Sequence, residues 1–364
     1  MTTTRRQFLT GVLALGAFAA LPQVARAGQK RLVMIHLFGG NDGLNTVIPY
    51  SDAAYKKARP SLALQEVLPI AAGLGLHPAL KPLLPLWQRG SMAIVQGVGY
   101  PEPNRSHFIS TDIWQSAGAH TPDGWLGRVA ASQGWDTVQV DDGSLCRALW
   151  TPPGSHSVPI CVQHDQPAPA PRPAWMQSAL DQLYACSDQS HLGATFAKLK
   201  NCQGEHWEGP PLSASLRAML DLWPAGRIFH TSLGGFDTHG DQGPRQSAGL
   251  GQLAVALAEF YGELQRRAWD KETLIVVYSE FGRRVQENAS QGTDHGGAAP
   301  LFLLGGKVKG GLYGEHPSLT NLVDGDLAHG HDFREVYATI LEDWLGAESR
   351  IVLGREFGKI AWWA

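Results

Sequence analysis

The sequence predicts an α/β fold in which a central, mostly parallel sheet is flanked by helices. Short apolar runs of strand length recur along the chain, and amphipathic segments of helical period separate several of them. Polar, glycine-rich loops that carry acids and histidines follow these runs directly, as at the ligand-binding edge of an α/β sheet. The expected strands are Leu32–Phe38, Ser91–Val98, Arg227–Ser232, Thr273–Tyr278 and Pro300–Leu304.

The N-terminus has the pattern of an export signal. It contains T-R-R-Q-F-L-T, the apolar run Gly11–Leu21 and A-R-A before Gly28. This pattern predicts that residues 1–27 are a twin-arginine signal, with the export machinery as a partner and a periplasmic or secreted location. The alternative is a membrane anchor, but the apolar run is shorter than the roughly 20 residues of a membrane span. No other stretch is long and apolar enough to cross a bilayer, so we expect no stable span in the mature chain.

Composition excludes one class of partner. The chain has 30 basic and 33 acidic residues, and removal of residues 1–27 takes away three arginines and leaves a net charge of −6. An acidic chain is a poor match for nucleic acid. The remaining 28–364 segment is long enough for one large α/β domain, which we expect, or for two small ones.

The middle of the chain, about residues 136–222, is loop-rich and contains all four cysteines. We expect an insertion or cap over the sheet here. Three disulfide pairings are possible in an oxidising compartment, and the simplest joins sequence neighbours, Cys146 with Cys161 and Cys186 with Cys202. Buried thiols are the alternative, because no C-x-x-C spacing indicates a metal or redox site.

The loop after the first expected strand is G-G-N-D-G-L-N. A tight turn explains two glycines beside an Asn-Asp pair. Its position after a buried strand favours a second role, in which Asp42 reaches a metal ion and Asn41 binds substrate.

A helix N-terminus follows the second expected strand. The segment N-R-S-H-F precedes apolar residues at helical spacing, so Ser106 lies at or near the first turn. Exposed N–H groups there attract anions, and a serine hydroxyl is well placed to attack an anionic ester. Arg105 and His107 flank it as further catalytic candidates. The alternative is that Ser106 only caps the helix.

Two more polar loops complete the set. Asp237 and His239 follow the third strand, and their spacing of two lets both side chains face one ion in an extended segment. Glu280, Arg283, Asp294 and His295 lie between the last two expected strands. We expect Arg283 to bind substrate, and the solvated polar turn remains the alternative for the Asp237 loop.

The expected ligands combine carboxylates and imidazoles without thiolates, a mixture that suits Zn²⁺, Mn²⁺ or Ca²⁺. They exceed what one catalytic ion would use, so a two-metal site is plausible. The candidates are Asp42, Asp237, His239, Glu280, Asp294 and His295.

Taken together, these segments resemble a known family. The twin-arginine leader, G-G-N-D-G-L-N-T-V-I-P-Y, N-R-S-H-F, G-W-L-G-R, G-G-F-D-T-H, S-E-F-G-R and G-T-D-H-G look like an exported bacterial family of unknown function, which is similar to the alkaline phosphatase–sulfatase superfamily. The resemblance implies that Asp42 is the acid after the first strand, Ser106 the nucleophile, Asp237 and His239 the acid–histidine pair, and His295 the last histidine.

The chain departs from the superfamily in two places. Ser279-Glu280-Phe281 stands where an Asp-His dipeptide is usual, and neither C-x-P-x-R nor S-x-P-x-R occurs, which argues against a formylglycine sulfatase. The resemblance therefore implies a metal-dependent hydrolase of small phosphate or sulfate esters. A non-catalytic exported binding or assembly protein that keeps the fold is the alternative.

Overall fold

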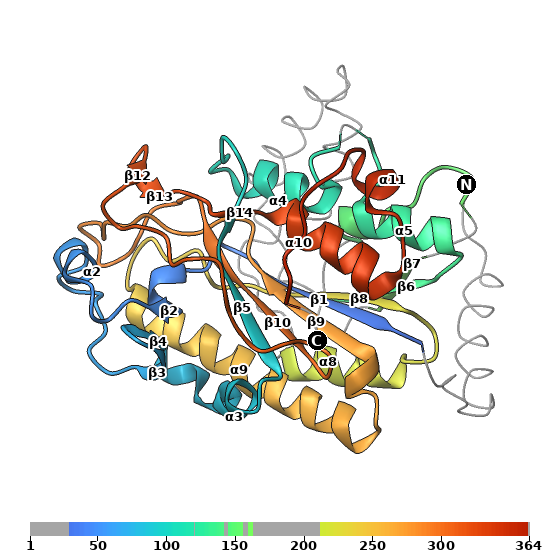
Figure 1. Cartoon of the computed structure of the whole chain (residues 1–364), viewed down its shortest axis with the longest axis horizontal. Helices are drawn as coiled ribbons and strands as arrows, with labels where there is room; N and C mark the ends of the chain where they lie inside the picture. Colours follow the sequence, from blue (N-terminus) through green and yellow to red (C-terminus); the bar gives the residue numbers. More distant parts are fainter. Residues whose placement is uncertain (1–28, 120, 142–144, 156–158, 163–211, 363–364) are drawn as a thin grey trace, which may run out of the picture.

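A central sheet with helices on both faces forms the body of the protein (Figure 1). The computed structural model describes residues 29–119, 121–141, 145–155, 159–162 and 212–362. The expected export signal and two of the cysteines, Cys186 and Cys202, lie outside this part, and so does the side chain of Cys161. In the ranges described, no helix combines the length and hydrophobicity needed to cross a bilayer.

The strand order confirms the predicted fold class. In spatial order the strands are β11 (Gly311–Tyr313), β5 (Met92–Gly99), β10 (Ala299–Gly305), β9 (Thr273–Tyr278), β1 (Arg31–Leu37), β8 (Ile228–Leu233), β6 (Thr137–Val140) and β7 (Pro159–Val162), and β14 (His331–Asp332) pairs with β5. Parallel pairing joins β1 to β8 and β9, β6 to β7 and β8, and β5 to β11 and β14. β10 runs antiparallel to both of its neighbours, β5 and β9.

Helical segments cover one face of the sheet (Figure 1). These are α4 (His107–Ser116), α5 (Trp125–Gln133), α10 (Phe333–Thr339), the π-helix η5 (Ile340–Leu345) and α11 (Ser349–Leu353). Their apolar side chains pack on alternate residues of β1, including Leu32 and Met34. Because side chains alternate along a strand, His36 belongs to this same face.

The opposite face packs against α8 (Leu212–Asp221), α9 (Gln242–Arg266), the 3₁₀ helix η2 (Pro78–Leu83) and α3 (Leu84–Gln88). Val33 and Ile35 of β1 point to this side. In α9 the apolar residues from Leu250 to Leu264 recur at spacings of three and four, which predicts one buried stripe, and these residues are buried.

Two expectations need correction. The sequence of residues 78–89 predicts one helix, but the structure divides it into a 3₁₀ and an α segment, because Pro82 and Pro85 lack the N–H groups of a regular helix. The stretch at about 136–222 is not wholly an insertion: β6 and β7 extend the central sheet, and α8 packs beside α9. The four residues of β6 are too few to stand out by periodicity.

The reversed direction of β10 determines where the loops meet. Because β10 is antiparallel, it begins at the edge where β1, β5, β8 and β9 end. The loops after β1, β5 and β8, and the segment between β9 and β10, therefore converge at this one edge. Around it lie the short helices η1 (Gly43–Asn45) and α2 (Ala53–Ala58), a small sheet of β2 (Val47–Ile48), β4 (Leu74–Leu76) and β3 (Leu68–Ala71), and the hairpin of β12 (Leu322–Val323) and β13 (Asp326–Leu327).

Candidate metal centre

Three histidines surround one aspartate oxygen at this edge of the sheet. The Nε2 atoms of His239 and His295 lie 3.1 and 3.2 Å from Oδ1 of Asp237, and Nε2 of His107 lies 3.5 Å from it. The Nε2 atoms of His239 and His295 are 2.9 Å apart. Ligands bound to one Zn²⁺ at about 2.0–2.1 Å are separated by roughly 3.3 Å in tetrahedral geometry. The atoms of Asp237, His239 and His295 are thus as close to one another as ligands that share an ion, and Nε2 of His107 lies at a similar distance from Asp237.

The other ring nitrogen of each histidine contacts an acceptor. Nδ1 of His107 lies 2.7 Å from Oε1 of Glu280, and Nδ1 of His239 lies 3.1 Å from Oδ1 of Asp294. Nδ1 of His295 lies 2.7 Å from the carbonyl oxygen of Arg105. A carbonyl can only accept, so this nitrogen carries a hydrogen, and in the neutral ring the lone pair is then on Nε2. Such outer hydrogen bonds fix the tautomer and orientation of metal-binding histidines.

The electrostatics of the cluster favour a cation. If every Nδ1 donates to its acceptor, three lone pairs face a carboxylate oxygen, and that arrangement is repulsive unless a proton or a metal ion lies between them. Without an ion, burial lowers the pKa of His107, but the carboxylates of Asp237 and Glu280 outweigh this effect and raise the pKa to about 9. Burial acts to raise the pKa of Asp237, yet its contacts with His107, His295 and Arg283 hold it well below its usual range.

Arg283 holds Asp237 in place and does not reach outward to a substrate. Its buried guanidinium donates to Oδ1 of Asp237 at 2.7 Å and to the carbonyl oxygens of Phe236, Gly40 and Thr293 at 3.0, 2.7 and 2.6 Å. It therefore joins the loops after β1 and β8 to the segment before β10. The expectation that Arg283 binds substrate is replaced by this structural role.

A glycine allows the β1 loop to approach the aspartate. Gly39 has a φ of +117°, and a Cβ atom there would lie 2.3 Å from the backbone nitrogen of Asp237. Only glycine combines this conformation with this contact. Gly39 is therefore required by the packing of the β1 loop against the Asp237 loop, beyond its role in a turn.

The centre is open on one side. The side chains of His107 and His295 are 17% and 20% exposed, whereas those of Asp237 and His239 are each 47% exposed. Asp294, behind His239, is 63% exposed. The exposed side chains of Asp237 and His239 lie in the loop between β8 and α9, so a ligand from solvent can approach the centre over this loop.

The remaining acids predicted as ligands hold the histidines instead. Glu280 is fully buried, and burial acts to raise its pKa, but hydrogen bonds from His107 and His36 keep this pKa well below its usual range. Its Oε1 accepts from the backbone N–H of Gly39 at 2.9 Å and from His107. Glu280 and Asp294 thus each orient one histidine through its Nδ1.

Asp42 and Asn41 belong to the structure of the β1 loop. Asp42 caps η1, accepts from the backbone N–H groups of Leu44 and Asn45 at 3.1 and 3.4 Å, and pairs with Arg59 and Gln242. The amide oxygen of Asn41 accepts from Thr46 and Gln246. The carboxylate oxygens of Asp42 accept four hydrogen bonds from the protein, so its expected role as a metal ligand is not supported. The amide oxygen of Asn41 is likewise bound within the loop, so its expected contact with substrate is not supported either.

Among the described residues, one group of acidic or histidine side chains has ligand atoms close enough to share an ion, namely His107, Asp237 and His295. His239 adjoins it through the contacts given above. The structure therefore brings together three of the six predicted ligands, Asp237, His239 and His295, and it supports one ion at this edge.

Ser106 lies between two residues that contact the cluster. It is the N-cap residue of α4, and its side chain makes no capping hydrogen bond. Its backbone N–H donates to Oδ1 of Asn104 at 2.9 Å. The preceding carbonyl of Arg105 holds His295, whereas the guanidinium of Arg105 pairs with the buried Asp326. The side chain of Arg105 therefore binds Asp326, and this contact does not support the direct catalytic role expected for it.

Two residues at the centre make contacts that the sequence did not reveal. His107 was expected to flank the nucleophile, but its Nε2 faces Asp237 as a candidate ligand. His36 lies inside the apolar run of β1 and contacts Glu280. A histidine in the middle of a buried strand was the available signal, since a buried polar ring requires a partner.

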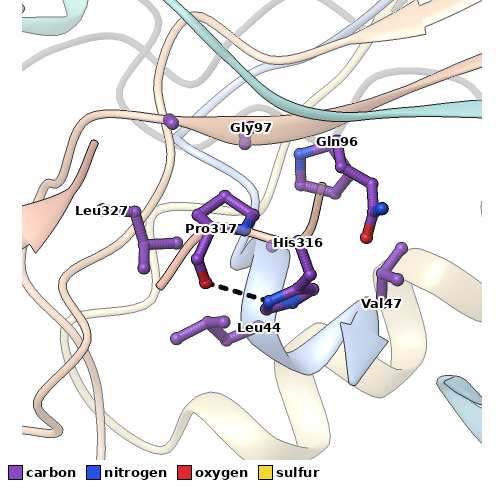
Figure 2. Close-up of a pocket in the computed structure, with 11 residues that line it drawn as sticks. Leu44, Val47, Gln96, Gly97, His316, Pro317 and Leu327 are labelled. Atoms are coloured by element: carbon purple, nitrogen blue, oxygen red, sulfur yellow. Dashed lines mark hydrogen bonds between the residues drawn. The ribbon is translucent and has the colours of Figure 1, made fainter. Parts of the chain in front are cut away.

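A small pocket at the same edge is separate from the centre. Figure 2 shows Leu44, Val47, Gln96, His316 and Pro317 around it, with Nδ1 of His316 hydrogen-bonded to the carbonyl oxygen of Pro317 at 3.0 Å. The lining is mainly apolar, and burial lowers the pKa of His316 so that its ring is neutral near pH 7. The space suffices for about one water molecule. None of the candidate ligands lines it.

The fold and the cluster define an α/β protein with a histidine–aspartate centre at the carboxyl edge of its sheet. Residues 222–355 match the model of a protein family of unknown function, DUF1501. The matched segment contains Asp237, His239, Glu280 and His295, whereas His107 precedes it. No curated protein matches the chain.

Solved structures of sulfatases and phosphoethanolamine transferases are similar in fold. The PsFucS1 sulfatase from Pseudoalteromonas sp. has 11% identity and a TM-score of 0.42, with 99% of this chain and 75% of that chain covered. The C-terminal periplasmic domain of EcEptC from Escherichia coli has 12% identity and a TM-score of 0.42, with 90% and 86% covered. The lipoteichoic acid synthase LtaP from Listeria monocytogenes has 9% identity and a TM-score of 0.38, with 80% and 71% covered. At these values the likeness concerns the general fold and not individual site residues.

Proposed function

We propose that this protein binds one divalent metal ion through His107, Asp237, His239 and His295 and hydrolyses phosphate or sulfate esters. The observation that carries the proposal is the convergence of three Nε2 atoms on Oδ1 of Asp237. Their Nδ1 atoms are each held by an acceptor, which is the arrangement of a metal centre with oriented histidines.

The ligand set favours Zn²⁺ or Mn²⁺. Three imidazoles and one carboxylate suit metals that accept both nitrogen and oxygen, whereas Ca²⁺ prefers a shell made of oxygens. When bound, the ion supplies a Lewis acid that polarises an ester oxygen and stabilises its developing charge. The half-exposed side chains of Asp237 and His239 support an approach of the substrate over the β8–α9 loop.

Ser106 is the proposed nucleophile. Its hydroxyl would lose its proton to water and form a bond to the phosphorus or sulfur atom as the bond to the leaving group breaks, and the leaving group would take a proton from water and depart as the alcohol. A second water molecule would then hydrolyse the serine ester, which releases the anion and returns the proton to the serine. The transferred group would lie at the N-terminus of α4, where unpaired N–H groups stabilise negative charge. The absence of a capping hydrogen bond leaves the Ser106 hydroxyl available for this role.

Metal content and hydrolysis test the proposal together. The protein lacking residues 1–27 would be purified, analysed for metal, and assayed with nitrophenyl phosphate, bis-nitrophenyl phosphate and nitrophenyl sulfate before and after chelation. We expect about one ion per chain and activity that chelation removes and Zn²⁺ or Mn²⁺ restores. His295→Ala should lose both.

The outcomes separate the two parts of the proposal. A protein that binds neither ion contradicts the metal centre itself. A protein that binds one ion but hydrolyses none of the three ester classes contradicts the hydrolase and supports an exported binding or assembly protein.

Export by the twin-arginine route is part of the same proposal, and it rests on the N-terminal pattern. We expect that replacement of both Arg5 and Arg6 by lysine retains the full-length protein in the cytoplasm, as cell fractionation and immunoblotting would show. Delivery of the double variant at the wild-type level would contradict this route.

A further inference from the structure

His36 is a buried histidine that is separated from the candidate metal centre by one residue, Glu280. It lies on β1 with only 3% of its surface exposed, and its ring stacks on Tyr278 at a centroid distance of 4.9 Å. Its Nε2 atom lies 3.0 Å from Oε2 of Glu280. A polar ring is costly inside a strand core, so this contact is the compensation for its burial.

Glu280 connects His36 to the centre. One carboxylate oxygen, Oε1, accepts from Gly39 and from Nδ1 of His107, and the other, Oε2, faces His36. The hydroxyl of Ser279 is 3.2 Å from Oε2, but it is only 2.7 Å from the carbonyl oxygen of Leu37. A hydroxyl has one hydrogen, and the shorter contact takes it. Among the described residues, His36 is therefore the donor that satisfies Oε2.

We propose that His36 is a positioning residue of the metal centre, which acts through Glu280 on the ring of His107. The inference rests on the proposed metal-binding function. Without His36, a buried charged oxygen has no donor, and the carboxylate relieves this by rotating. Rotation takes Oε1 away from Nδ1 of His107, so the ring no longer presents the lone pair of Nε2 to the ion.

The chain offers a matched control on the neighbouring strand. His230 of β8 is 2% exposed and lies on the same face of the sheet, because it pairs with Met34 in the parallel register. Its Nε2 atom is 3.5 Å from the hydroxyl of Tyr278, and its Nδ1 atom has no hydrogen-bond partner. His230 is thus as deeply buried as His36 but has no hydrogen bond to Glu280.

Metal affinity of the mature chain tests the proposal. Binding of Zn²⁺ and Co²⁺ would be measured by competition with a chelator, together with the visible spectrum of bound Co²⁺. We expect His36→Leu to weaken binding about 10- to 100-fold and to alter the Co²⁺ spectrum, as for other outer-shell partners. His36→Gln keeps a donor near the position of Nε2, so its affinity should stay within about threefold and its spectrum unchanged.

The remaining variants exclude a purely structural role. His230→Leu should keep the wild-type affinity and spectrum. If His36→Leu does not fold, His36→Asn replaces it, because its shorter amide cannot reach Oε2 and weakened binding is again expected.

Three results would overturn the role of His36 while leaving metal binding intact: wild-type affinity in His36→Leu, equal weakening in His36→Gln, or equal weakening in His230→Leu. A wild-type chain that binds neither Zn²⁺ nor Co²⁺ would overturn the proposed function and this inference with it.

Discussion

Asp42 and Arg59 form an ion pair in which both side chains are completely buried. Arg59 also donates to the carbonyl oxygens of Val285 and Arg284, at 3.0 and 2.9 Å. The pair therefore links the loop after β1 to the segment that leads to His295. A buried ion pair of this kind holds two loops in register at the edge of the sheet.

Removal of one partner of this ion pair should strongly destabilise the fold. We expect Arg59→Ala to lower the free energy of unfolding by about 3–5 kcal/mol, because the carboxylate of Asp42 stays buried without its counter-charge. Urea denaturation measures the change. Arg350→Ala removes an exposed arginine and should cost less than about 0.5 kcal/mol. A loss below about 1 kcal/mol for Arg59→Ala would show that the pair is not needed for the fold.

Loss of a metal ligand should lower metal affinity more than loss of an acceptor that only orients a ligand. We expect Asp237→Ala to abolish metal binding, because a ligand is lost, and Asp294→Ala to weaken it about tenfold, because only the support of His239 is lost. Asp294→Asn retains an oxygen that accepts from Nδ1 and should bind nearly as well as wild type. Equilibrium dialysis with Zn²⁺ gives the three affinities.

An exposed acid away from the centre is the control for this series. Asp221 lies at the end of α8, and Asp221→Ala should bind metal as wild type does. Equal affinities for Asp237→Ala and Asp294→Ala would contradict the assignment of Asp237 as the ligand.

Replacement of Ser106 separates a nucleophile from a cap. A nucleophilic hydroxyl predicts that Ser106→Ala abolishes ester hydrolysis and keeps the metal content and fold. The absent capping bond also predicts that the change costs less than the roughly 1 kcal/mol of a lost cap. Steady-state kinetics and thermal denaturation measure both quantities. Ser132→Ala removes a hydroxyl from α5 and should leave activity unchanged; activity of Ser106→Ala within a few-fold of wild type would identify water as the attacking group.

The buried ring of His230 should make the fold sensitive to acid. Burial, together with the nearby charge of His36, lowers the pKa of His230 from 6.5 to about 3. The unfolded chain takes up a proton below pH 6.5 and the folded chain does not, so the stability that neutral His230 contributes is lost as pH falls from 6.5 toward 3. From pH 6 to pH 4 this amounts to about 2–3 kcal/mol.

His230→Leu isolates this effect from other acid-sensitive groups. The wild type should lose about 2–3 kcal/mol more than the variant between pH 6 and pH 4, as measured by urea denaturation at both pH values. Parallel losses in the two proteins would mean that His230 titrates near its ordinary pKa in the folded state.

The sheet and the edge that carries the site follow from patterns that are local in the sequence. The apolar runs of β1, β5, β8, β9 and β10 are long enough to be recognised, and Asp237, His239 and His295 stand directly beside strand ends. The local sequence does not show which polar side chain is a candidate ligand and which only orients another ligand. Glu280 holds His107 from 173 positions away, and nothing near Glu280 indicates which nitrogen of that ring it contacts.

The role of Asp42 could not be predicted for a related reason. Its position after the first strand is typical of a ligand, but Arg59 approaches it through the fold of α2 and the small sheet beside it. An arginine 17 residues away has no recognisable spacing relative to Asp42. The same limit applies to β6, whose four residues become a strand only because β7 and β8 lie on either side of it.

The origin of the candidate ligands in the chain has a mechanical consequence. His107 belongs to α4, whereas Asp237 comes from the loop after β8, about 130 residues further along the chain, and an ion that holds both would act as a reversible cross-link between them. In the proposed metal-bound protein, unfolding must either break this link or release the ion, so heat resistance should rise with the concentration of free metal. Bound metal would then stabilise the folded chain by linking α4 to the loop after β8, and a chelator that removes the ion would remove this link.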